Sequence, residues 1–443
     1  MNIWQMHRLD AVAALAMCPV LAFCVFCQLY LCRLVIAAVG FRKSLWRAPR
    51  FVRTSADIDD EAGSTICQSN CLPKLLVIIP AHDEELMLGS TLDSIAGCRY
   101  PSGEVATLVI ADNCSDSTAI VAAKHGAWVA IRTDPGRVGK GYALQDAVSE
   151  LLNKSSNNRL SIDPHVYRFE FDAAVFLDAD TIVHHELLRA FASRLNEGDE
   201  GMQGCYGVSN AHQSMRTRLM VCALAIAHLA KPAGREKLGL SDGLKGNGFC
   251  LSRRLMNEVQ WSGESITEDI EYTLRLCEAG HRIRFVPDAL LWAQMPTSSS
   301  AAAAQRTRWE AGRYYLLRTR LRYLLTRAYQ RKDRIFADRV IDLIIPPFVE
   351  LAAIQFVLFT CSICVLLRTG WILSLVFAAL SGALLGVQGV CLLTSIWLAR
   401  IPLSIAVSLM YAPLYAFWKL MLVIGMLVAG PVRLWRRTAR HSD

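Results

Sequence analysis

Two aspartates that follow a short apolar segment are the feature of this sequence best suited to chemistry. Ala174–Leu177 is too short to cross a membrane and precedes Asp178 and Asp180, so we expect a buried strand that ends in two carboxylates. Residues i and i+2 of an extended chain point to the same side, so both carboxylates can reach one divalent cation that offsets their repulsion. A solvated loop with two ordinary aspartates is the alternative, and the pair alone does not decide between them.

Similar polar clusters follow other apolar segments between residues 74 and about 210. Segments predicted as strands cover 75–79, 107–110 and 128–131. Segments predicted as helices run to about Ala96, begin at Ser115–Thr118, and extend from Gly139-Lys140-Gly141 through Leu152. This alternation predicts an α/β fold with a doubly wound, mostly parallel sheet. Such sheets bind ligands beyond the carboxyl ends of their strands, where Asp83, Asp112, Asp178 and Asp180 all occur, so we expect one site there.

Residues 211–334 contain three further candidates. Gly246-Asn247-Gly248 is a glycine turn, where backbone can approach a ligand closely. Thr267-Glu268-Asp269 precedes the helical pattern 270–279, and a plain N-cap with acids on the helix dipole is its alternative interpretation. Gln305 and Arg308 share one face of a predicted helix with Trp309 beside them, although an interfacial helix has a similar composition.

The composition indicates a membrane protein. Of the 443 residues, 53% are hydrophobic and only 19% charged, which is apolar for a soluble protein. The net charge of +8 gathers near the hydrophobic segments, which suits an anionic membrane surface better than nucleic acid. The 15 cysteines are scattered, and Cys361 and Cys364, which have Cys-x-x-Cys spacing, lie in an apolar run. This pattern indicates a reducing, cytosolic environment for the soluble part.

Four stretches are predicted membrane segments. They are Ala11–Cys32, an uncleaved signal anchor, then Phe348–Leu367, Trp371–Leu398 and about Ile405–Ala429. The basic residues after the first predict a cytoplasmic domain, and Arg318–Arg339 predicts amphipathic helices on the membrane surface. Three C-terminal spans would place the tail outside, whereas its arginines favour the inside, so one stretch is expected to be interfacial or re-entrant.

Five motifs occur in an order that resembles a known family. They are Ile79-Pro80-Ala81-His82-Asp83-Glu84-Glu85, Ala111-Asp112-Asn113, Asp178-Ala179-Asp180, Thr267-Glu268-Asp269 and Gln305-Arg306-Thr307-Arg308-Trp309. Together they resemble the membrane-embedded family 2 glycosyltransferases, which include cellulose, hyaluronan and poly-N-acetylglucosamine synthases. The resemblance covers residues 74 to about 310. It departs from the family at His82, where an asparagine is common, and at Asn113, where a second aspartate is usual.

The resemblance implies a cytoplasmic GT-A domain that binds a nucleotide sugar, usually a UDP-sugar, and transfers the sugar with inversion. Asp83 and Asp112 would contact the uridine, and Asp178 and Asp180 the diphosphate and Mg²⁺ or Mn²⁺. Asp269 would be the general base, with Glu268 beside it in the substrate site. The remaining contacts to diphosphate, phosphate or acceptor would come from Lys140, Gly246, Asn247, Gly248, Gln305, Arg308 and Trp309.

The expected organisation follows from these assignments. It comprises a membrane anchor (1–40), a basic juxtamembrane segment and linker (41–73), the GT-A domain (74–310), amphipathic interfacial helices (311–347), transmembrane helices (348–430) and a basic tail (431–443). The expected protein is a metal-dependent hexosyltransferase of the plasma (inner) membrane. The leading interpretation is a processive synthase that elongates and translocates an extracellular polysaccharide, alone or with a homo-oligomeric or export partner. The alternatives are a single-sugar transferase acting on a membrane lipid and an inactive scaffold.

Overall fold

The computed structural model describes residues 3–53, 72–153, 160–263, 267–370 and 372–429. Most of the expected linker and the basic tail lie outside these ranges. Within them, one nine-stranded mixed sheet has the order β4-β3-β2-β1-β5-β8-β7-β9-β6. The strands are β1 Leu75–Ala81, β2 Val105–Asp112, β3 Trp128–Arg132, β4 Leu160–Ile162, β5 Ala173–Phe176, β6 Thr181–Val183, β7 Gly201–Val208, β8 Phe249–Ser252 and β9 Ile283–Ala293.

The parallel half of the sheet contains the four strands predicted from the sequence. β1 pairs in parallel with β2 and with β5, and β2 pairs in parallel with β3. Beyond β5 the sheet is mixed, because β8 pairs antiparallel with β5 and β7, whereas β7 pairs in parallel with β9. The carboxyl ends of β1, β2 and β5 therefore lie at one edge of the sheet, as expected for a doubly wound fold.

Helices cover both faces of this sheet, which explains why its strands are continuously apolar. Leu75, Val77 and Ile79 of β1 enter one buried cluster, and Leu76 and Ile78 enter the other. The first cluster includes residues of α4 Leu88–Ala96, α5 Thr118–Lys124, α7 Leu187–Asn196 and α8 Met215–Leu224. The second includes residues of α6 Lys140–Asn153, α10 Arg253–Glu258 and α11 Glu268–Glu278. Side chains alternate between the faces of a strand, so both sets must be apolar.

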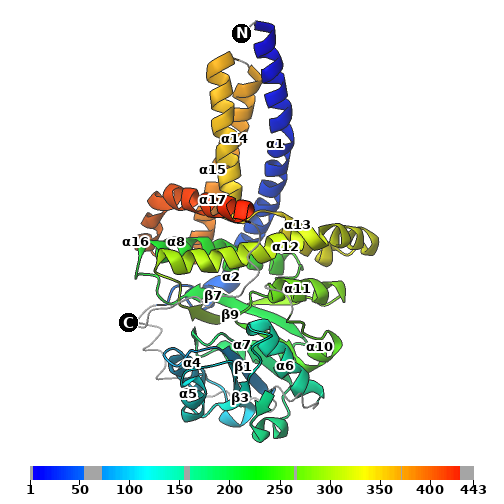
Figure 1. Cartoon of the computed structure of the whole chain (residues 1–443), viewed down its shortest axis with the longest axis vertical. Coiled ribbons are helices and arrows are strands. Elements are labelled where there is room, and N and C mark those ends of the chain that lie inside the picture. Colours follow the sequence, from blue (N-terminus) through cyan, green and yellow to red (C-terminus); the bar gives the residue numbers. More distant parts are fainter. Residues whose placement is uncertain (1–2, 54–71, 154–159, 264–266, 371, 430–443) are drawn as a thin grey trace.

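Three long helices project from the sheet domain as one bundle (Figure 1). They are α1 Ile3–Gly40, α14 Phe348–Thr369 and α15 Ile372–Leu398, and each packs against the other two. All three contain segments long and apolar enough to cross a membrane. Inside the bundle, buried Gln355 donates to Gln28 Oε1 at 3.3 Å, which is the kind of polar contact that joins membrane helices.

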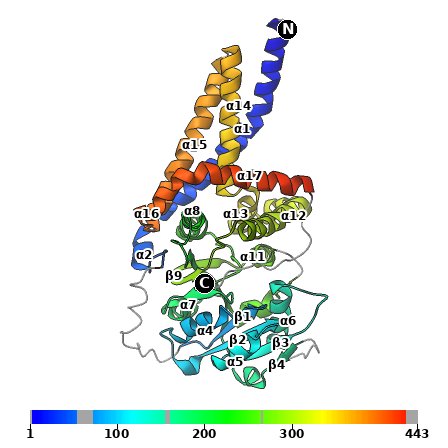
Figure 2. The ribbon, with the colours of Figure 1, turned by 60° about the vertical axis from the view of Figure 1, so that its left-hand side comes forward.

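The last apolar stretch differs from a simple span. It is divided into α16 Leu403–Ala406, a 3₁₀ turn Val407–Tyr411 and α17 Ala412–Ala429. Pro413 lies in the first turn of α17, where the missing N–H is tolerated, whereas a continuous helix through this point would lose a hydrogen bond. Figures 1 and 2 both show α17 lying across the bundle rather than along it. That one C-terminal stretch is interfacial or re-entrant stays a prediction, because this stretch also has the length and composition of a span.

Two further helices lie between the sheet and the bundle. α12 Ser299–Arg331 is one continuous helix, so the expected domain limit at residue 310 lies inside it, and α13 Arg334–Ile344 follows. Ser298 begins α12 by accepting from the backbone N–H of Ala301 at 3.3 Å. Figure 2 shows α12 and α13 beneath α17, and α12 packs directly against α17.

Candidate active site

The loop after β1 is joined to the loop after β2 through Asp83. The Asp83 carboxylate accepts hydrogen bonds from the backbone N–H groups of Ser115 at 2.6 Å and Asp116 at 3.3 Å. Its backbone is left-handed, with φ of 52°, a conformation that aspartate tolerates better than most residues. Asp83, Cys114 and Asp116 place potential ligand atoms within 4.8 Å of one another, but Asp83 and Asp116 both accept from backbone N–H groups there. We assign this cluster to shaping the two loops.

Asp112 is paired inside the protein. Its Oδ1 accepts from Arg132 Nη1 at 2.7 Å, and Arg132 Nε donates to Asp146 at 2.7 Å, with all three side chains buried. Burial raises the pKa of Asp112 despite this pairing. Arg132 also donates to the carbonyl of Arg137 at 2.8 Å, which holds the loop before α6. Sequence reasoning missed Arg132 and Asp146, although an arginine at the end of an apolar strand is a signal that a buried acid is near.

Lys140 connects three of the predicted motifs. It begins α6, and its ammonium contacts Asp178 Oδ1 and the carbonyl oxygen of Gly246. Burial disfavours the charged form, but the Asp178 carboxylate outweighs this effect, and the pKa of Lys140 lies above its usual value. The start of α6, the end of β5 and the glycine loop therefore meet at one ammonium group.

The glycine loop is also held to β5 by Asn247. The buried Asn247 side chain accepts from the backbone N–H of Asp178 at 3.0 Å and donates to Thr181 Oγ1 at 2.8 Å. Gln203 Nε2 donates to the carbonyls of Asn247 at 2.9 Å and Gly248 at 3.0 Å. Asn247 thus orients the acidic loop, and Thr181 and Gln203 are supporting residues that the sequence did not reveal.

The two glycines of this loop are needed for different reasons. Gly246 and Gly248 both have positive φ, at 73° and 68°. A Cβ on Gly246 would lie 3.3 Å from Asp269 Oδ2, so this glycine lets the loop approach the acid of the Thr267-Glu268-Asp269 motif. A Cβ on Gly248 would lie 2.2 Å from Leu291 Cδ2, so the second glycine is required by packing.

The acids at the start of α11 are half-buried beside this loop. Asp269 Oδ1 accepts from the backbone N–H of Ile270 at 2.8 Å. Burial raises the pKa of Asp269, and burial together with the Asp269 charge raises the pKa of Glu268 to about 7. A plain N-cap would lower both pKa values, so the acids at this helix start are the kind of perturbed group that functional sites contain.

α12 places the last motif along this site. A Cβ on Gly312 would lie 2.1 Å from Thr267 Cγ2, which shows how closely α12 packs on the start of α11. Gln305 is buried, while Arg308 and Trp309 are half-buried. On the other side of α12, buried Glu310 pairs with Lys419 of α17 at 3.0 Å. The helix therefore lies between the acids of α11 and the membrane-associated part of the protein.

The donor atoms around Asp178 and Asp180 suit a hard cation. The carboxylates follow β5 one residue apart, and the carbonyl of Gly246 adds a third oxygen beside Asp178. The Lys140 ammonium bridges that carboxylate and carbonyl, so the oxygens already surround one positive charge. Carboxylate and carbonyl oxygens are the ligands preferred by Mg²⁺ and Mn²⁺, so the residues fit such an ion.

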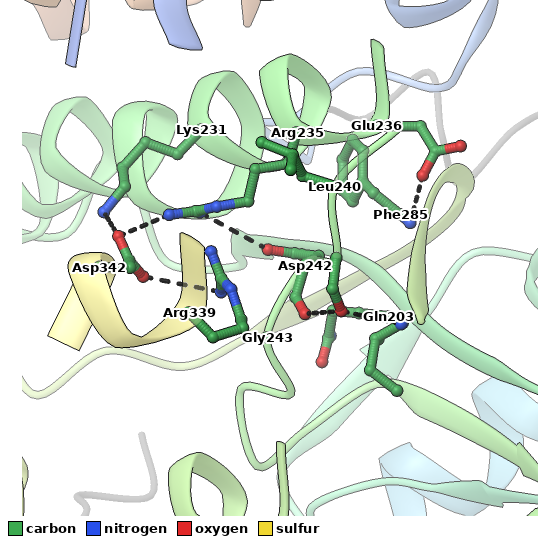
Figure 3. Close-up of polar contacts among 12 residues, drawn as sticks. Gln203, Lys231, Arg235, Glu236, Leu240, Asp242, Gly243, Phe285, Arg339 and Asp342 are labelled. Carbon is green, nitrogen blue, oxygen red and sulfur yellow. Dashed lines mark hydrogen bonds and ion pairs between the residues drawn. The ribbon is translucent and has the colours of Figure 1, made fainter. Parts of the chain in front are cut away.

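A buried network of charges joins α9, α13 and the segment before the glycine loop (Figure 3). Arg235 of α9 Lys231–Lys237 pairs with Asp338 at 3.0 Å and Asp342 at 2.5 Å, both on α13, and lies 4.0 Å from Asp242. Asp242 in turn contacts Lys245, the residue before Gly246. Tyr30 of α1 donates to Asp338 at 3.0 Å. This network links the bundle, α13 and the segment that carries the glycine loop.

Sheet order, strand-end acids and the five motifs define a glycosyltransferase of the GT-A fold. Residues 73–312 match the family model described as glycosyltransferase like family 2, which is more than half of the chain, so the protein belongs to this family. It is a family 2 glycosyltransferase, a class that transfers sugar from a nucleotide sugar, and its four candidate membrane helices associate it with membranes.

Several curated proteins are similar over part of their length. The chain is 28% identical to the probable glycosyltransferase YdaM of Bacillus subtilis, over 60% of this chain and 61% of YdaM. It is 20% identical to the beta-monoglucosyldiacylglycerol synthase of Synechocystis, over 62% and 55% of the two chains. It is 22% identical to the poly-beta-1,6-N-acetyl-D-glucosamine synthase of Staphylococcus aureus, over 56% of each. The matched part is less than two thirds of each relative.

Among solved structures, a mannosyltransferase from Pyrobaculum calidifontis in complex with GDP-Man and Mn²⁺ is similar over 85% of this chain and 99% of its own. The TM-score is 0.46 and the identity 14%.

Proposed function

We propose that this protein is an inverting, metal-dependent transferase that moves a hexose from a UDP-sugar to an acceptor at the membrane surface. The observation that carries the proposal is the convergence of Lys140, Asp178, Gly246 and Asp269 at the carboxyl edge of the sheet, beside the start of α11 on which α12 packs. The site contains a base, a cation and oxygen ligands within one set of contacts. Loss of nucleotide diphosphate from a sugar requires those groups.

Each residue has a role in this chemistry. Asp269 takes the proton of the acceptor hydroxyl, and its raised pKa makes it a stronger base than an ordinary aspartate. Lys140 and Arg308 offset the negative charge of the departing diphosphate, and Trp309 offers an apolar ring against which the acceptor packs. Asp178 and Asp180 would hold Mg²⁺ or Mn²⁺, which would supply further positive charge to the diphosphate. Displacement by the acceptor hydroxyl inverts the anomeric carbon.

The position of α17 favours a lipid acceptor over a growing polymer. α17 lies on α12 and is joined to it by the buried Lys419–Glu310 ion pair, and Lys419 also lies 3.4 Å from Glu350 of α14. The helix that carries Gln305, Arg308 and Trp309 is thereby covered on its membrane side, while α1, α14 and α15 pack on one another. An acceptor that remains in the membrane surface reaches this site from the side. A processive synthase remains the second candidate, supported by the similarity to the S. aureus polysaccharide synthase.

We further propose a topology with three crossings. α1, α14 and α15 span the inner membrane and α17 lies in its cytoplasmic surface, with Leu414, Phe417 and Met421 exposed toward lipid at helical spacing. The catalytic domain and the arginine-rich tail then share the cytoplasmic side, in agreement with the positive-inside rule.

A donor panel tests the proposal. The full chain in lipid nanodiscs would receive labelled UDP-glucose, UDP-N-acetylglucosamine, UDP-glucuronate, UDP-galactose or GDP-mannose, with Mn²⁺ or Mg²⁺, and products would be separated by size and by organic extraction. We expect a labelled product in the organic phase, and none in excess EDTA. A high-molecular-weight product would replace the lipid acceptor by the polymer, and full activity in EDTA would remove the metal assignment.

A further inference from the structure

Two arginines and three aromatic residues meet where α8, α12 and α17 pack together. Arg216 of α8 lies with its Cζ 4.9 Å from the ring centre of Trp418, and the Trp418 ring is 5.4 Å from that of Tyr415, also on α17. On α12, the Cζ of Arg306 lies 5.1 Å from the ring centre of Trp309. Met220 connects the two halves, because its sulfur contacts both Arg306 and the Tyr415 hydroxyl.

The arginine charges in this group are poorly satisfied by the described residues. Arg216 Nη2 donates to Ser299 Oγ at 2.7 Å, but its Nη1 is buried and has no hydrogen-bond partner among the residues that the structure describes. Arg306 Nη2 points at the thioether of Met220, which is a weak acceptor. Half-buried guanidinium groups on aromatic rings retain their preference for a bidentate acidic partner.

The position of the group matches the edge of a membrane. Trp418 is adjacent in sequence to Lys419, and Trp309 is adjacent to Glu310, so the buried Lys419–Glu310 ion pair fixes the two aromatic rings relative to each other. The exposed apolar residues Leu414 and Phe417 lie on the same helix as Trp418. A ligand held here would have its acidic head among the arginines and its apolar part along α17.

We propose that Arg216 and Arg306, flanked by Trp418 and Trp309, bind the phosphate of a membrane lipid and so present a phosphate-bearing lipid acceptor to Asp269. This inference rests on the proposed transfer to a lipid. It assigns the arginines and Trp418 to recognition of the lipid head, whereas the chemistry of transfer remains with Asp269 and the residues around Lys140.

Direct lipid binding tests the assignment without any turnover. The full chain in detergent micelles would be titrated with dioctanoyl phosphatidic acid, and separately with dioctanoylglycerol, which has the same tails without phosphate, and with inorganic phosphate; native mass spectrometry would count bound molecules. We expect phosphatidic acid to bind at least tenfold more tightly than dioctanoylglycerol. The change Arg216→Ala or Arg306→Ala should weaken its binding about tenfold, as loss of a charge-assisted contact does.

Two further variants keep the test decisive. Arg322→Ala removes an exposed arginine from the same helix as Arg306 and should change binding less than about twofold, because attraction to the anionic lipid from a distance is weak. Arg216→Lys keeps the charge and should retain more binding than Arg216→Ala, which separates charge from folding defects.

Equal binding of dioctanoylglycerol and phosphatidic acid, or equal losses in Arg322→Ala and Arg216→Ala, would overturn the site. If inorganic phosphate displaced phosphatidic acid at the same concentration, the assignment to a lipid would be overturned. Normal binding without turnover in the donor panel would instead contradict the proposed function.

Discussion

Two groups of charges adjoin the glycine loop 246–248: a half-buried group around Lys140 and a more deeply buried group around Arg235. In the Arg235 group, Lys231, Arg235 and Arg339 face Asp338 and Asp342. Burial alone would raise the pKa of both acids, but Arg235 and its neighbours outweigh burial, so the pKa of Asp338 is lowered and that of Asp342 lies well below its usual value.

The Lys140 group has the opposite balance. Asp178 contacts the ammonium of Lys140, whose charge also acts on Glu268 and Asp269, and the pKa values of Glu268 and Asp269 are raised. Similar residue types thus form three cations around two acids in the Arg235 group, whereas three acids gather around Lys140 in the other. The difference indicates where a cation or a proton is still required, which is the property expected of a reaction centre.

The largest effect that distinguishes the two groups should come from Asp269→Asn. The amide cannot accept the acceptor proton, so we expect turnover to fall by about 10²–10⁴-fold while donor binding changes little. The measurement is single-turnover transfer together with UDP-sugar binding by calorimetry. Glu271→Gln is the matched control, because Glu271 lies in the same helix turn and pairs with exposed Arg320 at 3.6 Å. Near-normal turnover in Asp269→Asn would remove the residue from the base role.

Removing Arg235 should affect stability instead. Arg235→Ala leaves Asp338 and Asp342 buried without their main partner, and we expect the free energy of unfolding to fall by about 3–5 kcal/mol. Arg254→Ala is the control. The Arg254 side chain is 79% exposed and lies 3.3 Å from Glu200, and exposed pairs contribute about 0–1 kcal/mol to stability. Denaturant unfolding of both variants in micelles measures the difference. Similar losses in the two would show that the Arg235 network is not a stabilising element.

We expect pH to have a smaller effect on the stability of the folded protein. Because the pKa of Glu268 is raised from 4.5 to about 7, the folded protein binds more protons than the unfolded chain between these values, and stability should fall as pH rises through this range. Glu268→Gln should remove part of this slope and stabilise the cation-free protein at pH 8 by about 1 kcal/mol. The acids of the Arg235 network have lowered pKa values, so their contribution should be constant over this window and lost only below about pH 4. Melting curves in EDTA from pH 5 to 8 provide the measurement, and an unchanged slope in the variant would contradict the assignment.

Much of the fold was predictable because its signals are local. The strands at 75–79, 107–110, 128–131 and 174–177 are confirmed with small changes at their ends, since a strand buried on both faces must be apolar throughout. The helices predicted after the first three of these strands are confirmed as α4, α5 and α6. The roles of the candidate site residues stay predictions, but their placement at one edge of the sheet follows from strand ends that sequence reasoning could locate.

What the sequence alone determined is therefore which segments are apolar, where they end and which chemical groups lie at those ends. Tertiary structure decided the partners of the charged groups. Lys140 contacts Asp178 and Gly246, which are 38 and 106 residues away in the sequence, and Arg132 forms an ion pair with Asp112. It also decided the direction of α17, which hydropathy marks as a span but which Lys419 joins to α12. Apolar patterning reports the local environment of a segment, whereas the partner of a charge depends on chain packing between residues that are distant in sequence.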